Sequence, residues 1–199
     1  MKKKLPFWNH NSAYYAWVRR KVTGCIRVLD VGCGDGTLAA YLAEDGRSVV
    51  GIDPDPDCIA LARKVCPSSV RLEQTHLEDF ASMGSFDAVI FCASLHHMDE
   101  NAAIRHAMAL LCPGGVLVIV GLAKPSRKAD YVRDALRVVP SAVVTFFRRM
   151  RSAEEIGIPV SDDYTPMDTV RAIARKLLPG ARLRHALHYR YLLEWRKPE

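Results

Sequence analysis

Residues 28–36, Val-Leu-Asp-Val-Gly-Cys-Gly-Asp-Gly, place three glycines at alternate positions directly after an apolar run. Glycine lets the backbone turn tightly and approach a ligand closely, and a helix that follows presents N–H groups without intrahelical partners. We therefore expect a strand, a tight ligand-binding loop and the start of a helix here. Thr37 stands where a dinucleotide-binding G-x-G-x-x-G loop has its third glycine, which argues against NAD or FAD.

Short apolar runs alternate with helical patterns along the first 120 residues or so. This alternation predicts a Rossmann-like, doubly wound α/β fold with a mostly parallel sheet, right-handed crossovers and helices on both faces. The expected strands are residues 26–31, 48–52, 70–74, 86–92 and 116–120, and the expected helices are residues 12–23, 37–44, 57–65 and 101–111. Ser12 is a candidate N-cap of the first helix.

The pattern changes after Lys124. We expect a basic and apolar helical region over 130–151 that breaks at Pro140, then a helix over 165–177 with Pro166 at its N1 position. A terminal antiparallel strand pair is expected over 182–187 and 189–196. The chain is predicted to be one domain, with an N-terminal cap helix (1–24), a cofactor-binding core (25–123), a lid (124–164) and a C-terminal helix and strand pair (165–199).

Composition narrows the functional class only a little. The net charge of +6 is partly gathered in residues 124–151, and by itself is weak evidence for nucleic acid or an anionic membrane. The six cysteines form no C-x-x-C pair, so neither a disulfide framework nor a metal site is expected, and a reducing cytoplasm fits them better. We expect no transmembrane segment and no signal peptide, because polar residues follow the basic N-terminus.

Asp53 ends the second expected strand, at the edge of the sheet where the glycine loop also lies. A carboxylate there could accept hydrogen bonds from both hydroxyls of a ribose. The alternative is that Asp53 caps the next helix, a role that Asp55 or Asp57 could fill instead.

Four segments, in the expected order, resemble motifs of the class I S-adenosylmethionine-dependent methyltransferases. They are VLDVGCGDG at 28–36, GIDPD at 51–55, FDAVIFCASLHHM at 86–98 and LLCPGGVLVIV at 110–120. More loosely, the whole chain is similar to the small-molecule branch that includes quinone-biosynthesis methyltransferases, and FWNHNSAYY at 7–15 resembles the N-terminal cap of that branch. The resemblance implies an enzyme that uses S-adenosylmethionine and releases S-adenosylhomocysteine.

The resemblance also implies roles for individual residues. It places the methionine part of the cofactor against the glycine loop and the loop after the fourth strand, at Asp30, Gly32, Cys33, Gly34 and Ala93. Asp53 would hold the ribose, and Pro54 would lie beside the adenine. Where the family usually has an acid for the adenine amine, this chain has His76, which departs from the pattern. His76 could still pair with the base, Leu77 could offer its backbone N–H, or Glu78 or Asp79 could compensate.

Methyl transfer requires an acceptor held in line about 3–3.5 Å from an already activated methyl group, and an oxygen or acidic carbon acceptor also benefits from a general base. His96 and His97 follow the fourth strand and are the candidate bases, although such a pair could simply pack the loop. Tyr14 is a further catalytic candidate, with His10 and Tyr15 beside it, and its alternative is a place in the core.

The acceptor is predicted to be a small hydrophobic or aromatic metabolite, methylated at O, C or N. Residues 124–164 could line its pocket, rest on an anionic membrane surface, or pack as an ordinary lid. Nucleic acid is a less favoured acceptor, because Cys92-Ala93-Ser94-Leu95 replaces the Asn/Asp-Pro-Pro-aromatic loop of many amino-group methylases. A non-catalytic cofactor-binding protein is the other alternative, and the sequence does not indicate an oligomeric state.

Overall fold

The structure is a computed structural model that describes residues 11–124, 126, 164–186 and 190–199. The helical region expected over 130–151, and the lid expected over 124–164 apart from its ends, lie outside the described residues. The same holds for residues 1–10 of the expected cap and for residues 187–189 between the last two strands.

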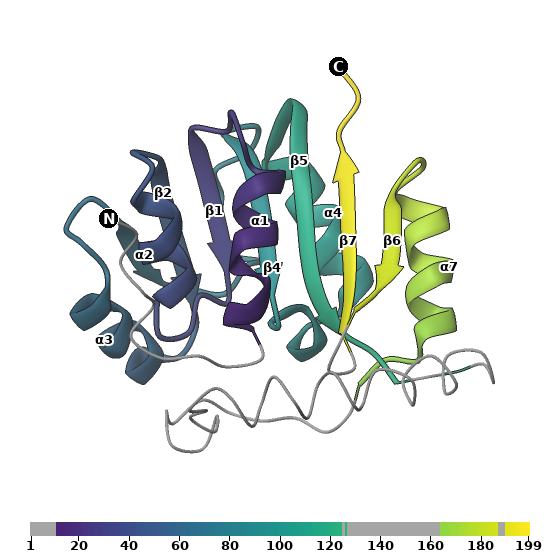
Figure 1. Ribbon diagram of the computed structural model, residues 1–199, viewed down its shortest axis with the longest axis horizontal. Helices are drawn as coiled ribbons and strands as arrows, with labels where there is room; N and C mark the ends of the chain where they lie inside the picture. The colour runs from purple at the N-terminus through teal and green to yellow at the C-terminus, as the bar shows by residue number, and fades with distance from the viewer. Residues whose placement is uncertain (1–10, 125, 127–163, 187–189) are drawn as a thin grey trace.

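Seven strands form one sheet in the order β3-β2-β1-β4-β5-β7-β6 (Figure 1). The strands are β1 (Arg27–Val31), β2 (Ser48–Asp53), β3 (Arg71–Gln74), β4 (Phe86–Cys92), β5 (Leu111–Leu122), β6 (Arg182–His185) and β7 (Arg190–Arg196). The first five strands are parallel, and β7 runs antiparallel to both β5 and β6. This confirms the predicted fold. The chain reverses its direction of winding between β1 and β4, where open α/β sheets bind ligands.

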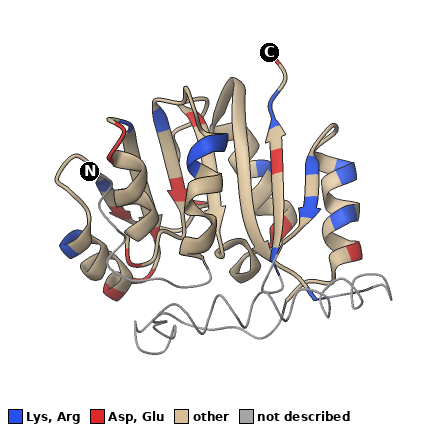
Figure 2. Ribbon diagram, in the orientation of Figure 1, with Lys and Arg blue, Asp and Glu red and all other residues tan. Residues whose placement is uncertain are grey.

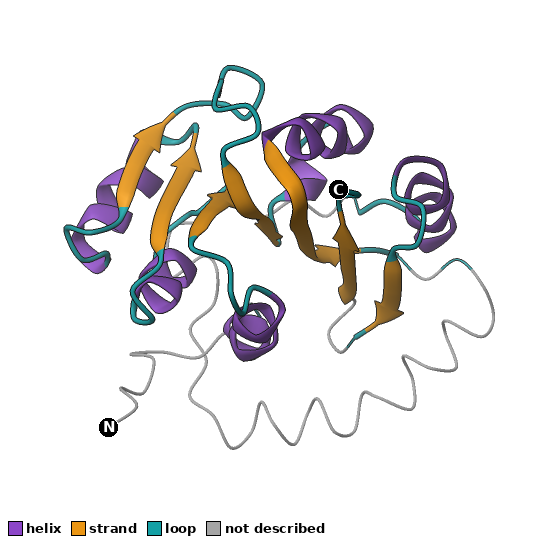
Figure 3. Cartoon of the chain, turned by 90° about the horizontal axis from the view of Figure 1, so that it is seen from above, coloured by secondary structure: helices purple, strands orange, loops and turns teal. Residues whose placement is uncertain are grey.

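Helices cover both faces of the sheet (Figure 3). They are α1 (Tyr15–Lys21), α2 (Thr37–Ala43), α3 (Pro56–Val65), α4 (Glu100–Leu110) and α7 (Met167–Leu177), with short 3₁₀ turns at Ser12–Tyr14 and Leu95–His97. One apolar cluster joins α1 and α2 to the sheet, and a second joins α4 and α7 to its other face. Strands β4 and β5 are buried on both sides, which explains their nearly continuous apolar sequences. Among the described residues, no helix is both long enough and apolar enough to cross a membrane.

The starts of α3 and α4 differ from the sequence expectation by one residue, and two other helix starts differ by more than a shift of their bounds. Ser12 begins a 3₁₀ turn rather than capping the first helix, which starts at Tyr15 without a side-chain cap. Pro166 precedes α7 instead of occupying its first turn, because its extended backbone forms a bridge with Lys124 at the end of β5. The Met167 N–H donates to the Lys124 carbonyl (2.9 Å), so α7 begins only after this bridge.

Asp87 ties the amino ends of β4 and β1 together. Its carboxylate accepts hydrogen bonds from the N–H groups of Ile26 (3.0 Å) and Arg27 (2.8 Å), and it pairs with the exposed Arg27 guanidinium (3.2 Å). Partial burial by itself raises the Asp87 pKa, but the two amide bonds and the Arg27 charge outweigh it and lower the pKa below its ordinary value. A lowered folded pKa means stability that is present above the unfolded pKa and lost as the pH falls.

We expect Asp87→Asn to lower the free energy of unfolding by about 1–2 kcal/mol at neutral pH, because hydrogen bonds to a carboxylate become bonds to a neutral amide. Most of this loss of stability comes from the hydrogen bonds with the N–H groups of Ile26 and Arg27, since solvent screens the exposed ion pair with the Arg27 guanidinium. Urea unfolding at several pH values measures it, with exposed Asp79→Asn as the control. The difference from wild type should shrink as Asp87 becomes protonated, and a pH-independent difference would contradict this account.

Candidate active site

The glycine loop is held against the end of β2. The N–H groups of Gly32 and Cys33 both donate to the Ile52 carbonyl, at 2.9 and 3.0 Å. Gly32 has a φ of +67°, and a Cβ atom there would lie 2.4 Å from the Ser94 Cβ. The loop therefore passes so close to the segment after β4 that only glycine fits at this position.

Asp53 fixes the same loop from the end of β2. Its carboxylate accepts one hydrogen bond from the Gly34 N–H (2.9 Å) and another from the Asp55 N–H (3.0 Å), and the residue is only 8% exposed. The cap of α3 is Asp55, which accepts from the Asp57 N–H (2.8 Å). Asp53 therefore does not cap α3. Its carboxylate oxygens have further lone pairs that can accept hydrogen bonds in addition to these two.

A cavity of about 70 Å³ opens between the glycine loop, the segment after β4 and the N-terminal helix. Five residues predicted for the cofactor line it, namely Asp30, Gly32, Cys33, Gly34 and Ala93. It is also lined by Asn11, Tyr15, Asp35, Leu38 and Cys92. Burial raises the pKa of the Cys92 thiol to about 12, with a contribution from the Asp30 charge, so this wall of the cavity is neutral.

Asp30 is the buried acid of this cavity, with 1% of its surface exposed. Its Oδ2 atom accepts no hydrogen bond from any described residue. Burial, followed by the nearby charges of Asp53 and Asp35, raises the pKa of Asp30 to about 7. The ionised form of Asp30 is therefore costly in this cavity, and a cation or a strong hydrogen-bond donor that reached the carboxylate would stabilise it.

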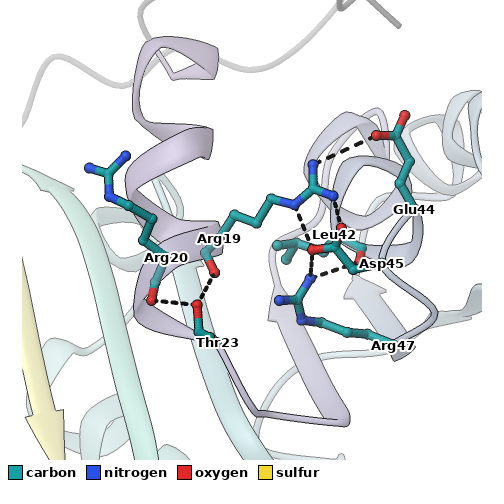
Figure 4. Close-up of polar contacts among 7 residues, drawn as sticks. All are labelled: Arg19, Arg20, Thr23, Leu42, Glu44, Asp45 and Arg47. Carbon is teal, nitrogen blue, oxygen red and sulfur yellow. Dashed lines mark hydrogen bonds and ion pairs between the residues drawn. The ribbon is translucent and has the colours of Figure 1, made fainter. Parts of the chain in front are cut away.

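Helix α1 places Tyr15 at the cavity, and ion pairs connect α1 to the end of α2. Arg19 forms ion pairs with Asp45 and with Glu44, the latter at 3.8 Å, and Asp45 also pairs with Arg47 (Figure 4). Burial, together with Cys92 and the two acids of the cavity, raises the Tyr15 pKa well above its ordinary value. The Tyr15 hydroxyl therefore keeps its proton and remains a hydrogen-bond donor.

His96 and His97 share the 3₁₀ turn after β4, with ring centroids 3.9 Å apart. His97 is exposed, whereas His96 is half-buried, packs edge-on against Tyr164, and its Nδ1 atom has no hydrogen-bond partner among the described residues. Burial first, then the charges of His97 and Arg190, lower the His96 pKa to about 4. The His96 imidazole is therefore neutral at pH 7, and the same lowering of its pKa makes it a weaker base than an ordinary histidine.

Arg190 and Asn11 meet at the carboxyl edge of the sheet, although 179 positions separate them. Arg190 is buried at the start of β7, and its guanidinium donates a hydrogen bond to the Asn11 Oδ1, so the N-terminal segment is tied to the C-terminal strand pair. Tyr14, a predicted catalytic residue, is half-buried beside this contact but does not line the described cavity. Sequence reasoning missed Asn11 and Arg190, because no local motif signals a contact of this range.

The segment after β4 is strained where it faces the glycine loop. Ala93 has a φ of +59°, in the left-handed region that L-residues rarely adopt. The next residue, Ser94, is buried and donates its hydroxyl hydrogen to the Val31 carbonyl at 2.5 Å. Strain of this kind persists only where its surroundings enforce it, and it concentrates at functional sites.

Four predicted cofactor residues do not line the described cavity, namely Asp53, which holds the glycine loop from the end of β2, and three others. Pro54 and His76 are exposed, and the Leu77 side chain lies in the apolar core. Both exposed residues remain at the edge of the sheet near Asp53, because the Thr75 N–H donates to the Asp53 carbonyl (3.1 Å) and the Gln74 amide to the Pro54 carbonyl (3.5 Å).

Known proteins are similar to this chain in sequence and in fold. A family model described as a methyltransferase domain matches residues 28–115. An uncharacterized methyltransferase of Mycobacterium tuberculosis is 34% identical over 199 residues, which cover 96% of this chain and 98% of the relative. This chain belongs to the class I S-adenosylmethionine-dependent methyltransferases. The cofactor of this family is S-adenosylmethionine, and a solved methyltransferase of the same fold holds the product, S-adenosylhomocysteine.

Two further methyltransferases show how far the likeness extends. The ubiquinone biosynthesis O-methyltransferase of Cronobacter sakazakii is 30% identical over 184 residues, covering 81% of this chain and 73% of the relative. The solved 1,6-didemethyltoxoflavin-N1-methyltransferase of Burkholderia thailandensis has the same fold, with a TM-score of 0.61 at 19% identity, covering 96% of this chain and 79% of that one.

The cavity fits one end of this cofactor. S-adenosylmethionine carries an ammonium and a sulfonium group, and the unpaired Asp30 oxygen is the kind of partner that a buried cation requires. At about 70 Å³ the cavity holds only part of such a ligand.

Proposed function

We propose that this chain transfers a methyl group from S-adenosylmethionine to a small hydrophobic or aromatic metabolite, at an oxygen, carbon or nitrogen atom. The observation that carries the proposal is Asp30, whose unpaired buried oxygen lies in a cavity between the glycine loop and Ala93. Support for a small acceptor comes from the ubiquinone biosynthesis relative and from the toxoflavin-type structure, which was solved with its small-molecule substrate bound. We place this activity in the cytoplasm, which suits six cysteines that are all unpaired.

The proposed cofactor contacts follow the geometry of the loop. Asp30 would pair with the ammonium group, and the backbone of Gly32, Cys33, Gly34 and Ala93 would surround the methionine chain. Asp53 would accept the ribose hydroxyls with its remaining lone pairs. Pro54, His76 and Leu77 would border the adenine beyond the end of β3.

When bound, the cofactor supplies a methyl group that its sulfonium already activates. The task of the chain is then to orient the acceptor, exclude water and remove a proton from the attacking atom. His96 is the proposed base, because its imidazole is neutral and its Nδ1 atom is unpartnered among the described residues. The proton of an acceptor hydroxyl would pass to that nitrogen, while Tyr14 would help to position the acceptor.

We expect His96→Gln to lower kcat by about 10²–10⁴-fold on an acceptor that must lose a proton, and to leave the affinity for S-adenosylhomocysteine unchanged. His97→Gln is the matched control, since His97 lies next in the chain but is exposed, and it should lose less than about threefold. Steady-state kinetics and isothermal titration measure the two effects. Full turnover by both variants would remove the general base from the mechanism.

The acceptor class can be tested with a radiolabelled methyl donor. Incubation of the purified chain with a metabolite extract, and separately with bulk RNA and DNA, should label only the small-molecule fraction. Labelled nucleic acid would instead favour the rival acceptor class. No transfer to any fraction, together with intact cofactor binding, would favour a non-catalytic cofactor-binding protein.

A further inference from the structure

Tyr164 lies just before α7 and packs its ring against the imidazole of His96. The two ring centroids are 5.5 Å apart, and the ring planes meet at 71°. An edge-to-face arrangement of this kind is one of the favoured geometries for aromatic rings at such a separation. Both residues are half-buried, and they belong to segments that are distant in the sequence. The contact therefore restricts the orientations that the imidazole can adopt.

The backbone that follows Tyr164 is fixed from two sides. The Lys124 N–H, just after β5, donates to the Thr165 carbonyl (3.1 Å), and the Met167 N–H donates to the Lys124 carbonyl (2.9 Å). The Thr165 hydroxyl donates a hydrogen bond to the carboxylate of Glu100, the half-buried first residue of α4. Contacts that do not involve His96 therefore determine where Tyr164 lies.

The start of α7 is stabilised as well. This helix begins at Met167 with Asp168 in its first turn and basic residues in its last turn, an order of charges that suits the helix dipole (Figure 2). The Asp168 N–H also donates to the hydroxyl oxygen of Ser126 (3.0 Å), which is a second link between α7 and the segment that follows β5. Tyr164 thus precedes a helix end that is held against the sheet.

The His96 imidazole is not oriented in the way that is common for a catalytic histidine. In many such sites a carboxylate accepts a hydrogen bond from one ring nitrogen and so fixes the ring. Here the buried Nδ1 atom has no hydrogen-bond partner among the described residues, and the ionisable groups that affect the His96 pKa are His97 and Arg190, neither of which is an acid. The His97 ring belongs to the same short turn, so Tyr164 supplies the described ring contact that comes from another segment.

We propose that Tyr164 is a positioning residue, which holds the imidazole of His96 in one orientation at the carboxyl edge of the sheet by ring contact. This inference rests on the proposed function, in which His96 removes a proton from the acceptor. Because a misplaced catalytic group loses much of its effect, the Tyr164 ring then contributes to the rate of transfer and not to cofactor affinity. The contact needs the aromatic ring and not the hydroxyl, so phenylalanine should replace Tyr164 and leucine should not.

Histidine NMR on the full chain tests the placement and needs no acceptor. The His96 ring signals are assigned by their loss in His96→Gln. In the wild type we expect nuclear Overhauser contacts between the rings of His96 and Tyr164, a result that does not depend on the folding of any variant. Tyr164→Leu should remove the ring-current shift of the His96 ring protons and raise the measured His96 pKa by about one pH unit or more, because water then reaches the imidazole. Tyr164→Phe should keep both close to wild type.

Tyr41 offers a matched control. It is also a half-buried tyrosine, but it lies on α2 and packs against Tyr15. Tyr41→Leu should therefore leave the His96 signals and the His96 pKa unchanged. Melting and titration with S-adenosylhomocysteine show whether Tyr164→Leu and Tyr164→Phe are folded and bind the cofactor product as the wild type does.

The link to catalysis is measured as the initial rate of radiolabelled methyl transfer to a metabolite extract at saturating S-adenosylmethionine. We expect Tyr164→Leu to lower this rate about tenfold or more and Tyr164→Phe to lower it less than about twofold. Absence of the Overhauser contacts in the wild type, or unchanged His96 signals in Tyr164→Leu, would overturn the proposal. Displaced His96 signals with a wild-type rate would overturn it too, because the contact would then serve packing alone. A wild-type chain that labels nothing in the extract would instead contradict the proposed function, and the NMR comparison would still decide whether Tyr164 places His96.

Discussion

Gly32→Ala should weaken binding of S-adenosylhomocysteine by about 100-fold or more and lower the free energy of unfolding by about 2–6 kcal/mol. The new Cβ would lie 2.4 Å from the Ser94 Cβ, so one of the two segments must move. Ser94 is buried and its hydroxyl is bonded to the Val31 carbonyl, which leaves the glycine loop to shift. Such a shift would displace the backbone that the cofactor approaches. Titration calorimetry and urea unfolding measure the two quantities.

Gly46→Ala separates backbone strain from steric overlap. Gly46 has a φ of +77°, close to the +67° of Gly32, but a Cβ there meets no atom within 4 Å. We expect a loss of only about 1–2 kcal/mol and normal cofactor affinity, because the strain of a left-handed conformation is the sole cost. If the two variants behaved alike, close contact between the glycine loop and Ser94 would not be what fixes the site.

Asp30→Asn should have two opposite effects, a more stable ligand-free protein and a weaker complex. Because the folded pKa of Asp30 is raised to about 7, the native state holds a proton that the unfolded state has lost between about pH 4 and 7. Stability from this group therefore falls as the pH rises through that window. The groups facing Asp30 give it no compensating cation, since Asp53 and Asp35 are acids and Tyr15 is neutral.

We expect Asp30→Asn to raise the free energy of unfolding by about 1–3 kcal/mol near pH 8. This gain is smaller than the whole cost of holding Asp30 ionised in the folded state, because the asparagine amide is itself buried. The gain should disappear near pH 4–5, where the wild-type carboxyl is protonated in both states. Affinity for S-adenosylhomocysteine, which keeps the ammonium group, should fall about 10–100-fold. The exposed Asp79→Asn serves as the control.

Proton release gives an independent readout on the wild type. Near pH 6.5, pairing of Asp30 with the ligand ammonium should expel a proton, so the measured binding heat should change with the ionisation enthalpy of the buffer. The buffer dependence should vanish in Asp30→Asn. Equal proton release by both proteins, or a variant that is less stable near pH 8, would contradict the role given to Asp30.

Local patterns predicted most of the core of this fold. The apolar run of β4 and the glycines before α2 are signals that depend on neighbours in the sequence, so these elements lie where the sequence placed them. The fifth strand was expected over 116–120, but β5 begins at Leu111, because Leu111 already pairs with Phe86 of β4. The Pro166 bridge to Lys124 was missed, because it depends on a contact made only after the chain folds. Helix ends elsewhere differ by a residue or two, since competing caps such as Asp55 and Asp57 are equivalent until packing selects one.

The candidate site also contains residues that a local motif identified and residues whose position depends on distant contacts. Asp30, Gly32 and Gly34 line one cavity, because the motif that contains them is continuous, and their contact with the cofactor stays a prediction. The wall built by Asn11 and Tyr15 comes from the N-terminal segment and helix α1, whose positions depend on Arg19 and on the distant Arg190. The sequence offered Tyr14 and Tyr15 as a pair of candidates, and only the packing of α1 on α2 determines that Tyr15 faces the cavity.

The most direct test of the central claim is one calorimetric comparison, in which the purified chain is titrated with S-adenosylhomocysteine and, under the same conditions, with NAD. The G-x-G-x-G loop, the unpaired Asp30 oxygen and Asp53 predict saturable one-site binding of S-adenosylhomocysteine and no binding of NAD. Binding of NAD without S-adenosylhomocysteine would contradict the assignment of this cavity.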